Sequence, residues 1–197
     1  MEDQSSGKEP EMRKLVVKEW MTLDGVIDAD NMDQWWVPYD SPERRAHITE
    51  GLERSDTYLL GRVTYEMLAP YWSALPDEAE GGIAGLLNHM QKYVVSSSLA
   101  RADWQPSSII RDDVVEAITQ LKQQPGRDIL IDGSATLVRS LMATDLIDEY
   151  RLLIQPVVMG TGKRLFTNEI PSAQLKLMDA TPLSLGVVAL TYQPDRQ

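Results

Sequence analysis

The segments LLGRVTYE (residues 59–66) and ILIDGSATLV (residues 129–138) decide the fold of this chain. In each, an apolar strand runs into a glycine, Gly61 or Gly133, which leads directly into the start of a helix. Glycine lets the backbone approach a ligand closely, and the free N–H groups of a first helical turn favour a negatively charged group. We therefore expect the two glycine turns to converge on one groove and to hold an elongated, phosphate-bearing ligand. This pattern predicts an enzyme with a nucleotide cofactor.

The composition is that of one compact domain. The chain has 197 residues, and its 43% hydrophobic content is enough to bury a full core. The side chains include 19 basic and 30 acidic ones, which gives a formal net charge of −11. A field of that sign repels nucleic acids and anionic membrane surfaces, so neither is expected as a partner. A small phosphate-bearing ligand stays compatible, because local donors act at short range while the distant field is screened by salt.

Residue usage also excludes several kinds of site. The absence of cysteine excludes disulfides, zinc–thiolate sites and thiol nucleophiles, and it fits a cytoplasmic protein. His47 and His89 lack the spacing of a metal-binding helix, so no metal is expected. No stretch approaches the ~18 apolar residues of a membrane span. The polar residues 1–12 are expected to form a disordered tail, which leaves residues 13–197 as a single domain.

Hydrophobic periodicity predicts strands that alternate with helices and then strands alone. The expected strands are 15–21, 57–60, 93–95, 108–110, 129–131 and 150–159, with a closing antiparallel pair at 175–177 and 185–192. The expected helices are 42–54, 63–68, 86–91, 114–124 and 137–142. Pro70 is expected to end the second helix, Asp113 and Glu116 to open the fourth as a capping box, and Pro156 to mark a bulge or an edge. The order implies an α/β fold with a mostly parallel sheet, helices on both faces and an antiparallel end.

The first glycine turn carries groups that suit a phosphate. Gly61 permits close approach, Arg62 can pair with a phosphate through two hydrogen bonds, and Thr64 can donate from its hydroxyl and its N–H. The alternative is an ordinary strand-to-helix turn with a solvated arginine.

The second turn has only small side chains, those of Gly133, Ser134, Ala135 and Thr136, where a ligand would lie. Ser134 can cap the helix, with or without a ligand. Neither of the two common nucleotide motifs is present. No G-x-G-x-x-G follows a strand, and GTGK at residues 160–163 lacks both the first glycine of a Walker motif and its final Ser/Thr.

Two further polar groups are candidates for the site. Ser96, Ser97 and Ser98 follow a strand and offer hydroxyls and amides to the adenosine side of a cofactor, although serine loops are common. Asp24, which precedes a glycine, can orient a substrate or relay a proton. Stabilisation of its own turn is an equally good explanation.

Aromatic side chains could form the wall of a site for a flat substrate. Trp35, Trp36 and Tyr65 are the candidates, together with Tyr71 and Trp72. The alternative is that each of them belongs to the core, which is the commoner place for aromatic residues near helices.

The order of the motifs resembles that of one family. These motifs are TLDG (22–25), LGRVTYE (60–66), YVVS (93–96), DGSA (132–135), LIDEYRL (146–152) and PVVMGTGKRLF (156–166). From about Arg13 to Tyr192 the chain is similar to the reductase domain of the bacterial bifunctional riboflavin-biosynthesis deaminase–reductases, as a stand-alone member. The last motif is the most specific.

This resemblance implies a dihydrofolate reductase-like three-layer sandwich, with a sheet of about eight strands, an antiparallel C-terminal hairpin and NADPH bound across the strand ends. It assigns Gly61, Arg62 and Thr64 to the cofactor phosphates. It places residues 96–98 beside the adenosine ribose, and residues 133–136 along the pyrophosphate and the nicotinamide ribose. It also implies a homodimer paired through the sheet edge.

The resemblance has clear departures. The bifunctional enzymes carry a zinc deaminase with H-x-E and P-C-x-x-C motifs, which a chain without cysteine cannot form. Glu43, Glu50 and Glu53 offer no clear counterpart of the carboxylate on the first helix of dihydrofolate reductase.

The leading hypothesis is an NADPH-dependent reductase that transfers a hydride to a small pyrimidine- or pterin-like heterocycle, with a proton from water or Asp24. In this hypothesis Arg62 favours the 2′-phosphate of NADPH. The alternative is a catalytically silent nucleotide-binding or dimeric interaction protein on the same scaffold. A flavin-dependent reductase is disfavoured, because no residue pattern suggests an isoalloxazine site.

Overall fold

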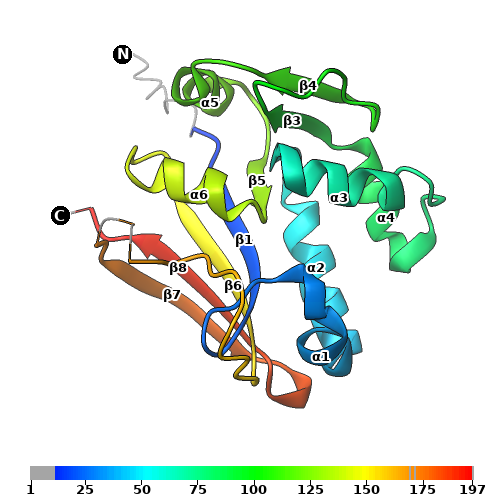
Figure 1. Cartoon of the computed structure of the whole chain (residues 1–197), viewed down its shortest axis with the longest axis vertical. Coiled ribbons are helices and arrows are strands. Elements are labelled where there is room, and N and C mark those ends of the chain that lie inside the picture. Colours follow the sequence, from blue (N-terminus) through cyan, green and yellow to red (C-terminus); the bar gives the residue numbers. More distant parts are fainter. Residues whose placement is uncertain (1–11, 169, 171, 197) are drawn as a thin grey trace, which may run out of the picture.

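The computed structural model describes residues 12–168, 170 and 172–196 (Figure 1). Apart from Met12, the predicted disordered tail of residues 1–12 lies outside them. The strands are β1 (Leu15–Thr22), β2 (Ser55–Gly61), β3 (Gln91–Val95), β4 (Ser107–Ile110), β5 (Asp128–Asp132), β6 (Glu149–Gln155), β7 (Leu175–Pro182) and β8 (Val188–Pro194). The α-helices are α1 (Met32–Trp35), α2 (Pro42–Glu53), α3 (Arg62–Trp72), α4 (Ile83–His89), α5 (Val114–Gln123) and α6 (Ala135–Met142).

These strands form one eight-stranded sheet in the order β4-β3-β2-β5-β1-β6-β8-β7. The pairs from β4 to β6 are all parallel, whereas β8 is antiparallel to both β6 and β7. Each connection between two parallel strands brings the chain back to the end of the sheet where those strands begin, as the alternation of strands and helices predicts. The predicted α/β fold, with its antiparallel C-terminal hairpin, is confirmed.

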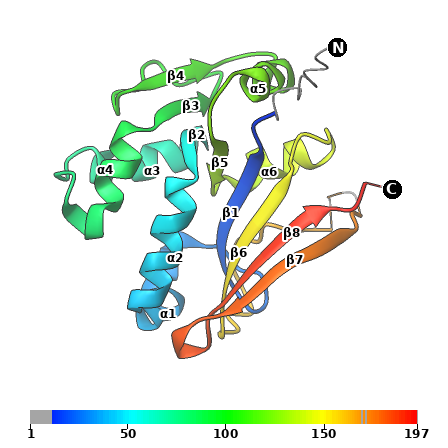
Figure 2. The same ribbon diagram turned by 180° about the vertical axis from the view of Figure 1, so that it is seen from behind.

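Helices cover both faces of the sheet. In Figure 1 α6 lies in front of the sheet, and in the reverse view of Figure 2 α2 lies in front. Successive strand residues point to opposite faces, so Val17 and Ile131 pack with α5 and α6, while Val16 and Leu130 pack with α2 and α4. The central strands β1, β2 and β5 are thus buried on both sides, which leaves their ends as the places where a ligand can reach them.

One register difference opens the sheet at the carboxyl ends of its central strands. Strand β1 pairs with β5 only up to Lys18, which lies opposite Asp132. On its other side β1 continues to pair with β6 as far as Thr22. Residues 19–22 of β1 therefore extend beyond the end of β5, and the chain leaves β5 through Gly133 at that point.

The structure corrects four of the predicted boundaries and caps. Helix α3 continues through Pro70. This proline lies in the last turn of the helix, where its missing N–H group removes only one hydrogen-bond donor. Strand β6 ends at Gln155, before Pro156 rather than through it. Asp113 has φ +47 and makes no side-chain cap hydrogen bond, so the capping box is not formed. Ser134 likewise has φ +62 and does not cap α6 with its side chain.

Among the described residues, no helix has the combination of length and hydropathy that crossing a membrane requires.

Candidate active site

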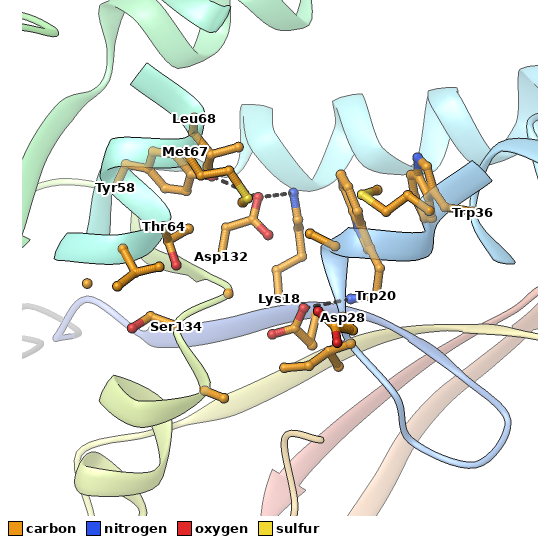
Figure 3. A pocket seen from close by; sticks show the side chains of 18 of the residues that line it. Lys18, Trp20, Asp28, Trp36, Tyr58, Thr64, Met67, Leu68, Asp132 and Ser134 are labelled. Atoms are coloured by element: carbon orange, nitrogen blue, oxygen red, sulfur yellow. Dashed lines mark hydrogen bonds and ion pairs between the residues drawn. The ribbon is translucent and has the colours of Figure 1, made fainter. Parts of the chain in front are cut away.

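A cavity of about 1040 Å³ lies at the carboxyl ends of β1, β2 and β5, and we call it the main cavity. Its walls include both glycine turns, the end of β1 and the segment around α1. Figure 3 shows Thr64 and Ser134 on one side and Trp20 and Trp36 on the other, with Lys18 and Asp132 between them. A cavity of this size at the strand ends of an α/β sheet is the usual place for a cofactor and a substrate.

The two glycine turns meet at this cavity, as the sequence predicts. A Cβ atom built on Gly61 would lie 2.8 Å from the Cβ of Ser134 and closer still to its Oγ. Gly133 has φ +67, and a Cβ there would lie 3.4 Å from Cγ2 of Thr64. Each turn therefore fits against the other only because residue 61 has no side chain. The convergence of residues 61 and 133 on one groove is present in the structure.

We expect Gly61→Ala to lower the free energy of unfolding by about 2 kcal/mol, because the new methyl overlaps Ser134. The backbone at residue 61 is extended, with φ −78, so alanine costs nothing there except this contact. Adding Ser134→Gly to this variant should restore the stability. It removes the side chain that the new methyl overlaps, and it places a glycine at residue 134, where φ is positive. Urea unfolding of the three variants measures this coupling.

Gly51→Ala is the matched control, because no atom lies within 4 Å of a Cβ at this helical position. It should raise stability by up to about 1 kcal/mol. Equal stability of Gly61→Ala and the wild type would mean that the two turns are not in contact.

Both helices that follow the glycine turns begin at the cavity without a side-chain cap. Neither Gly61 before α3 nor Ser134 before α6 makes a side-chain cap hydrogen bond. Thr64, Ala135 and Thr136 also line the cavity, and Thr64 is 9% exposed. Two sets of free N–H groups thus face one space, an arrangement suited to an elongated anionic ligand.

Arg62 lines the same cavity but is exposed and pairs with Glu66 at 2.7 Å, one turn further along α3. This is the solvated arginine of the alternative explanation. The ion pair is exposed on both sides, so it is weak and leaves the guanidinium able to exchange Glu66 for a ligand anion.

The sequence interpretation missed a buried charged group at the centre of the cavity. Lys18 Nζ lies 2.8 Å from Asp132 Oδ2, and the Tyr58 hydroxyl donates to the same oxygen at 2.8 Å (Figure 3). Burial raises the pKa of Tyr58 well above its usual value, and the charge of Asp132 adds to this effect. Tyr58 therefore stays a hydrogen-bond donor that fixes the carboxylate. The sequence did contain a signal for this group, because two adjacent charged residues, Lys18 and Glu19, lie inside a strand that is buried on both faces.

Glu19 follows Lys18 and also lines the main cavity, since β1 extends past β5 at this point. Its side chain is almost fully buried, with the residue 7% exposed. Oε1 accepts a bond of 3.2 Å from the Trp20 N–H, and Oε2 has no partner among the described residues. Burial, and then the negative charge of Asp132, raise the pKa of Glu19 from 4.5 to about 8. Glu19 therefore carries a proton at neutral pH.

Tryptophans form the wall at the α1 end. The rings of Trp20 and Trp36 are stacked with centroids 3.9 Å apart, and the guanidinium of Arg44 lies 3.7 Å from the centroid of Trp36. Trp35 lines the cavity as well, and its indole N–H donates to the Asp28 carbonyl at 3.0 Å. Both predicted tryptophans line the cavity, although Trp35 is only 2% exposed, as the core alternative expects, and Trp20 joins them from the first strand. Their role in binding a substrate stays a prediction.

Tyr65 is not part of this wall, which corrects its prediction as a substrate-binding residue. It is 4% exposed, and its hydroxyl accepts a hydrogen bond of 2.8 Å from the Trp104 N–H. Its ring packs in the core with residues of α4 and with Trp104.

Ser96, Ser97 and Ser98 follow β3 at the same edge of the sheet, but only their neighbour Val95 lines the main cavity. Ser96 Oγ accepts from the N–H groups of Ser98 and Leu99, so this hydroxyl stabilises its own turn. The assignment of these serines to the adenosine side stays a prediction.

Asp24 is not among the residues that line the cavity. It accepts from the Thr22 hydroxyl at 2.6 Å and from the N–H groups of Met159 and Gly160, and it pairs with Arg164 at 3.1 Å. The Thr22 bond, followed by those from the two N–H groups, lowers the pKa of Asp24 far below its usual range. A carboxylate held in this way does not give up or take a proton at neutral pH. Only the Thr22 bond lies within the turn itself, as the turn-stabilising alternative expects, and the other three contacts join this turn to residues 159–164.

A sheet of this order with a cavity at its strand ends is the dihydrofolate reductase fold. The model of the RibD C-terminal domain family matches residues 13–189, and the chain belongs to that family. It is 33% identical over 181 residues to the uncharacterized protein YyaP of Bacillus subtilis (strain 168), which covers 91% of this chain and 94% of YyaP.

Solved structures agree with this fold. A putative riboflavin biosynthesis protein from Shewanella sp. PV-4 has a TM-score of 0.74 and 20% identity, covering 93% of this chain and all of that one. Dihydrofolate reductase from Enterococcus faecalis, complexed with NADP(H) and RAB-propyl, has a TM-score of 0.61 and 17% identity, covering 92% of this chain and 96% of that one. The resemblance stated from the sequence motifs is confirmed at the level of family and fold.

Proposed function

We propose that this protein is an NADPH-dependent reductase of a small heterocyclic substrate. The observation that carries the proposal is the meeting of two glycine turns, with two uncapped helix starts, at the cavity that also holds Lys18 and Asp132. Membership of the RibD C-terminal domain family and the NADP(H) complex of a protein with the same fold support the choice of cofactor.

The residues present fit such a cofactor. The space in front of Gly61 and Gly133 is bordered by small side chains, so a pyrophosphate can reach the N–H groups that begin α3 and α6. Thr64 and Thr136 add hydroxyl donors, and Arg62 adds a cation at the outer rim. When bound, NADPH supplies a hydride from its nicotinamide ring.

The substrate has its place at the opposite end of the cavity. The stacked rings of Trp20 and Trp36 offer an apolar wall for a planar ring, and Arg44 behind them keeps Trp36 in position. Lys18 presents an ammonium group that Asp132 and Tyr58 fix in direction. The chain's contribution is therefore to orient the reacting carbon, to exclude water and to keep a fixed charge beside it.

The homodimer predicted from the family belongs to the same proposal. Strand β7 forms one edge of the described sheet, and it exposes Leu177 and Met178. A second copy that pairs along this edge would cover both side chains.

The cofactor assignment can be tested by titrating NADPH while following tryptophan emission, because Trp20, Trp35 and Trp36 line the cavity. We expect quenching with a micromolar Kd, and Arg62→Ala should weaken NADPH binding about 10-fold through loss of a charge-assisted bond. NADH binding should change little in that variant, since NADH has no 2′-phosphate.

Arg54→Ala is the matched control for this titration. Arg54, the C-cap residue of α2, forms the same kind of exposed pair with Glu50, four residues earlier, and does not line the cavity. Equal quenching by NADH and NADPH in the wild type would exclude a 2′-phosphate contact at Arg62. The absence of any quenching would count against the proposed function as a whole.

A further inference from the structure

Glu19 is a buried acid whose role the cofactor site does not explain. Its Oε2 has no hydrogen-bond partner among the described residues, although the residue is 7% exposed and lines the main cavity. An unpartnered buried oxygen is costly, so each such group calls for an explanation, and use by a ligand or a reaction is one. Glu19 follows Lys18 on β1 and points to the opposite face of the sheet, but it lies in the part of β1 that extends past the end of β5, where both residues line the main cavity.

Another buried glutamate, Glu149, offers a comparison, because ion pairs keep its carboxylate charged. Glu149 is 5% exposed, but it pairs with Lys14 and Arg151 and accepts a hydrogen bond from Gln193. Burial alone would raise its pKa, and these cationic partners lower it below the usual value. Glu19 has no ion pair among the described residues, so the same burial leaves it protonated.

The charged groups around Glu19 come from several elements. Asp132 on β5 disfavours a second negative charge, and Lys18 on β1 favours it, but Lys18 is already paired with Asp132. Asp28 and Lys163 line the cavity from two loops as a pair of 3.6 Å, and Arg139 lines it from α6. Lys18 is therefore paired with Asp132 and Lys163 with Asp28, and neither cation is paired with Glu19.

Building on the proposed function, we propose that Glu19 is the catalytic acid, which delivers a proton from Oε2 to the heteroatom of a C=N or C=O bond in the substrate. The hydride forms a new C–H bond at the carbon, and the π electron pair moves to the nitrogen or oxygen. That pair takes the Glu19 proton and forms an N–H or O–H bond. Glu19 is left as a carboxylate, and it regains a proton from solvent after the product leaves.

Lys18 is less suited to this step. Loss of its proton would leave Asp132 as a buried anion with no cationic partner, whereas Glu19 starts neutral and has no ion pair to break. In this division of work Lys18 positions the substrate and Glu19 supplies the proton. Asp24, whose carboxylate is held by Thr22 in its own turn and by Met159, Gly160 and Arg164 in the loop after β6, takes no part.

The first test reads the proton without any substrate or cofactor. Dicyclohexylcarbodiimide reacts with protonated carboxyl groups in apolar cavities, so the free protein should form a stable acylurea at Glu19, located by peptide mass spectrometry. Labelling should fall about 10-fold between pH 7 and pH 9. Glu149, equally buried but paired, is the internal control and should stay unlabelled. The proposal is overturned if Glu19 is unlabelled or if its labelling does not change with pH.

The second test uses a substrate found by screening pterins, pyrimidines and small carbonyl compounds for NADPH oxidation. Glu19→Gln keeps the shape and removes the proton, so kcat should fall at least 100-fold while the Kd for NADPH stays the same. In the wild type, kcat/KM should decline above about pH 8, and this decline should be absent in Glu19→Gln.

The outcomes separate the two proposals. Unchanged turnover and an unchanged pH profile in Glu19→Gln would remove Glu19 from the mechanism and leave the reductase intact. If no compound in the screen oxidised NADPH, the proposed function would fail, and the labelling result would still decide whether Glu19 presents a proton to the cavity.

Discussion

Replacing Lys18 with methionine is expected to lower kcat for NADPH oxidation by about 100-fold or more, because the fixed charge beside the substrate is lost. The same change should lower the free energy of unfolding by about 3 kcal/mol. Asp132 and Lys18 are both largely buried, with side-chain exposures of 16% and 9%, and a carboxylate that keeps only the Tyr58 hydroxyl is poorly compensated. Steady-state kinetics and urea unfolding of the same preparation measure the two effects.

A second substitution separates catalysis from stability. The double variant Lys18→Met/Asp132→Asn contains neither charge, so its stability should return to within about 1 kcal/mol of the wild type. Its turnover should stay low, since the ammonium group is still missing. Recovery of both stability and turnover would mean that the pair only holds the sheet together. The single variant Asp132→Asn should lower turnover too, because Lys18 loses the partner that fixes its direction.

The general architecture could be predicted because it depends on local patterns. Strands that alternate with helices produce parallel pairing, and in a parallel sheet the carboxyl ends of neighbouring strands meet at one edge. Gly61 and Gly133 follow β2 and β5, which are neighbours in the sheet, so the sequence could place both turns at one groove. Where the local pattern was ambiguous, as for Pro70 near the end of α3, the prediction was wrong.

The substrate end of the site could not be predicted in the same way. Lys18, Glu19 and Trp20 lie within a strand that reads as apolar, and Lys18 and Glu19 were overlooked because strands buried on both faces rarely hold charges. Their role depends on the register that ends the β1–β5 pairing at Lys18 and Asp132. That register joins residues far apart in the chain, and no local pattern specifies it. Asp24 stood in a conspicuous motif instead, yet its contacts hold its own turn and join it to the loop at Met159.

Glu19→Gln is expected to stabilise the protein, and more so at high pH. The pKa of Glu19 is raised from 4.5 to about 8, first by burial and then by Asp132. A raised pKa in the folded state means that stability is full below pH 4.5, where the acid is protonated in both states, and is lost as the pH rises towards 8. Each pH unit in this window costs about 1.36 kcal/mol, so the loss reaches roughly 5 kcal/mol. Glutamine has no such cost.

Urea unfolding of the wild type and Glu19→Gln at pH 5 and pH 9 measures this difference, and the comparison cancels the titration of all other groups. The advantage of the variant should be below about 1 kcal/mol at pH 5 and several kcal/mol at pH 9. Glu149→Gln is a control of opposite sign. Its carboxylate has a lowered pKa, so its contribution to stability is present above pH 4.5 and lost in acid, and the variant should be less stable at neutral pH. A Glu19→Gln advantage of the same size at both pH values would show that Glu19 is already charged at pH 5, and it would remove the physical basis for a proton held at the end of β1.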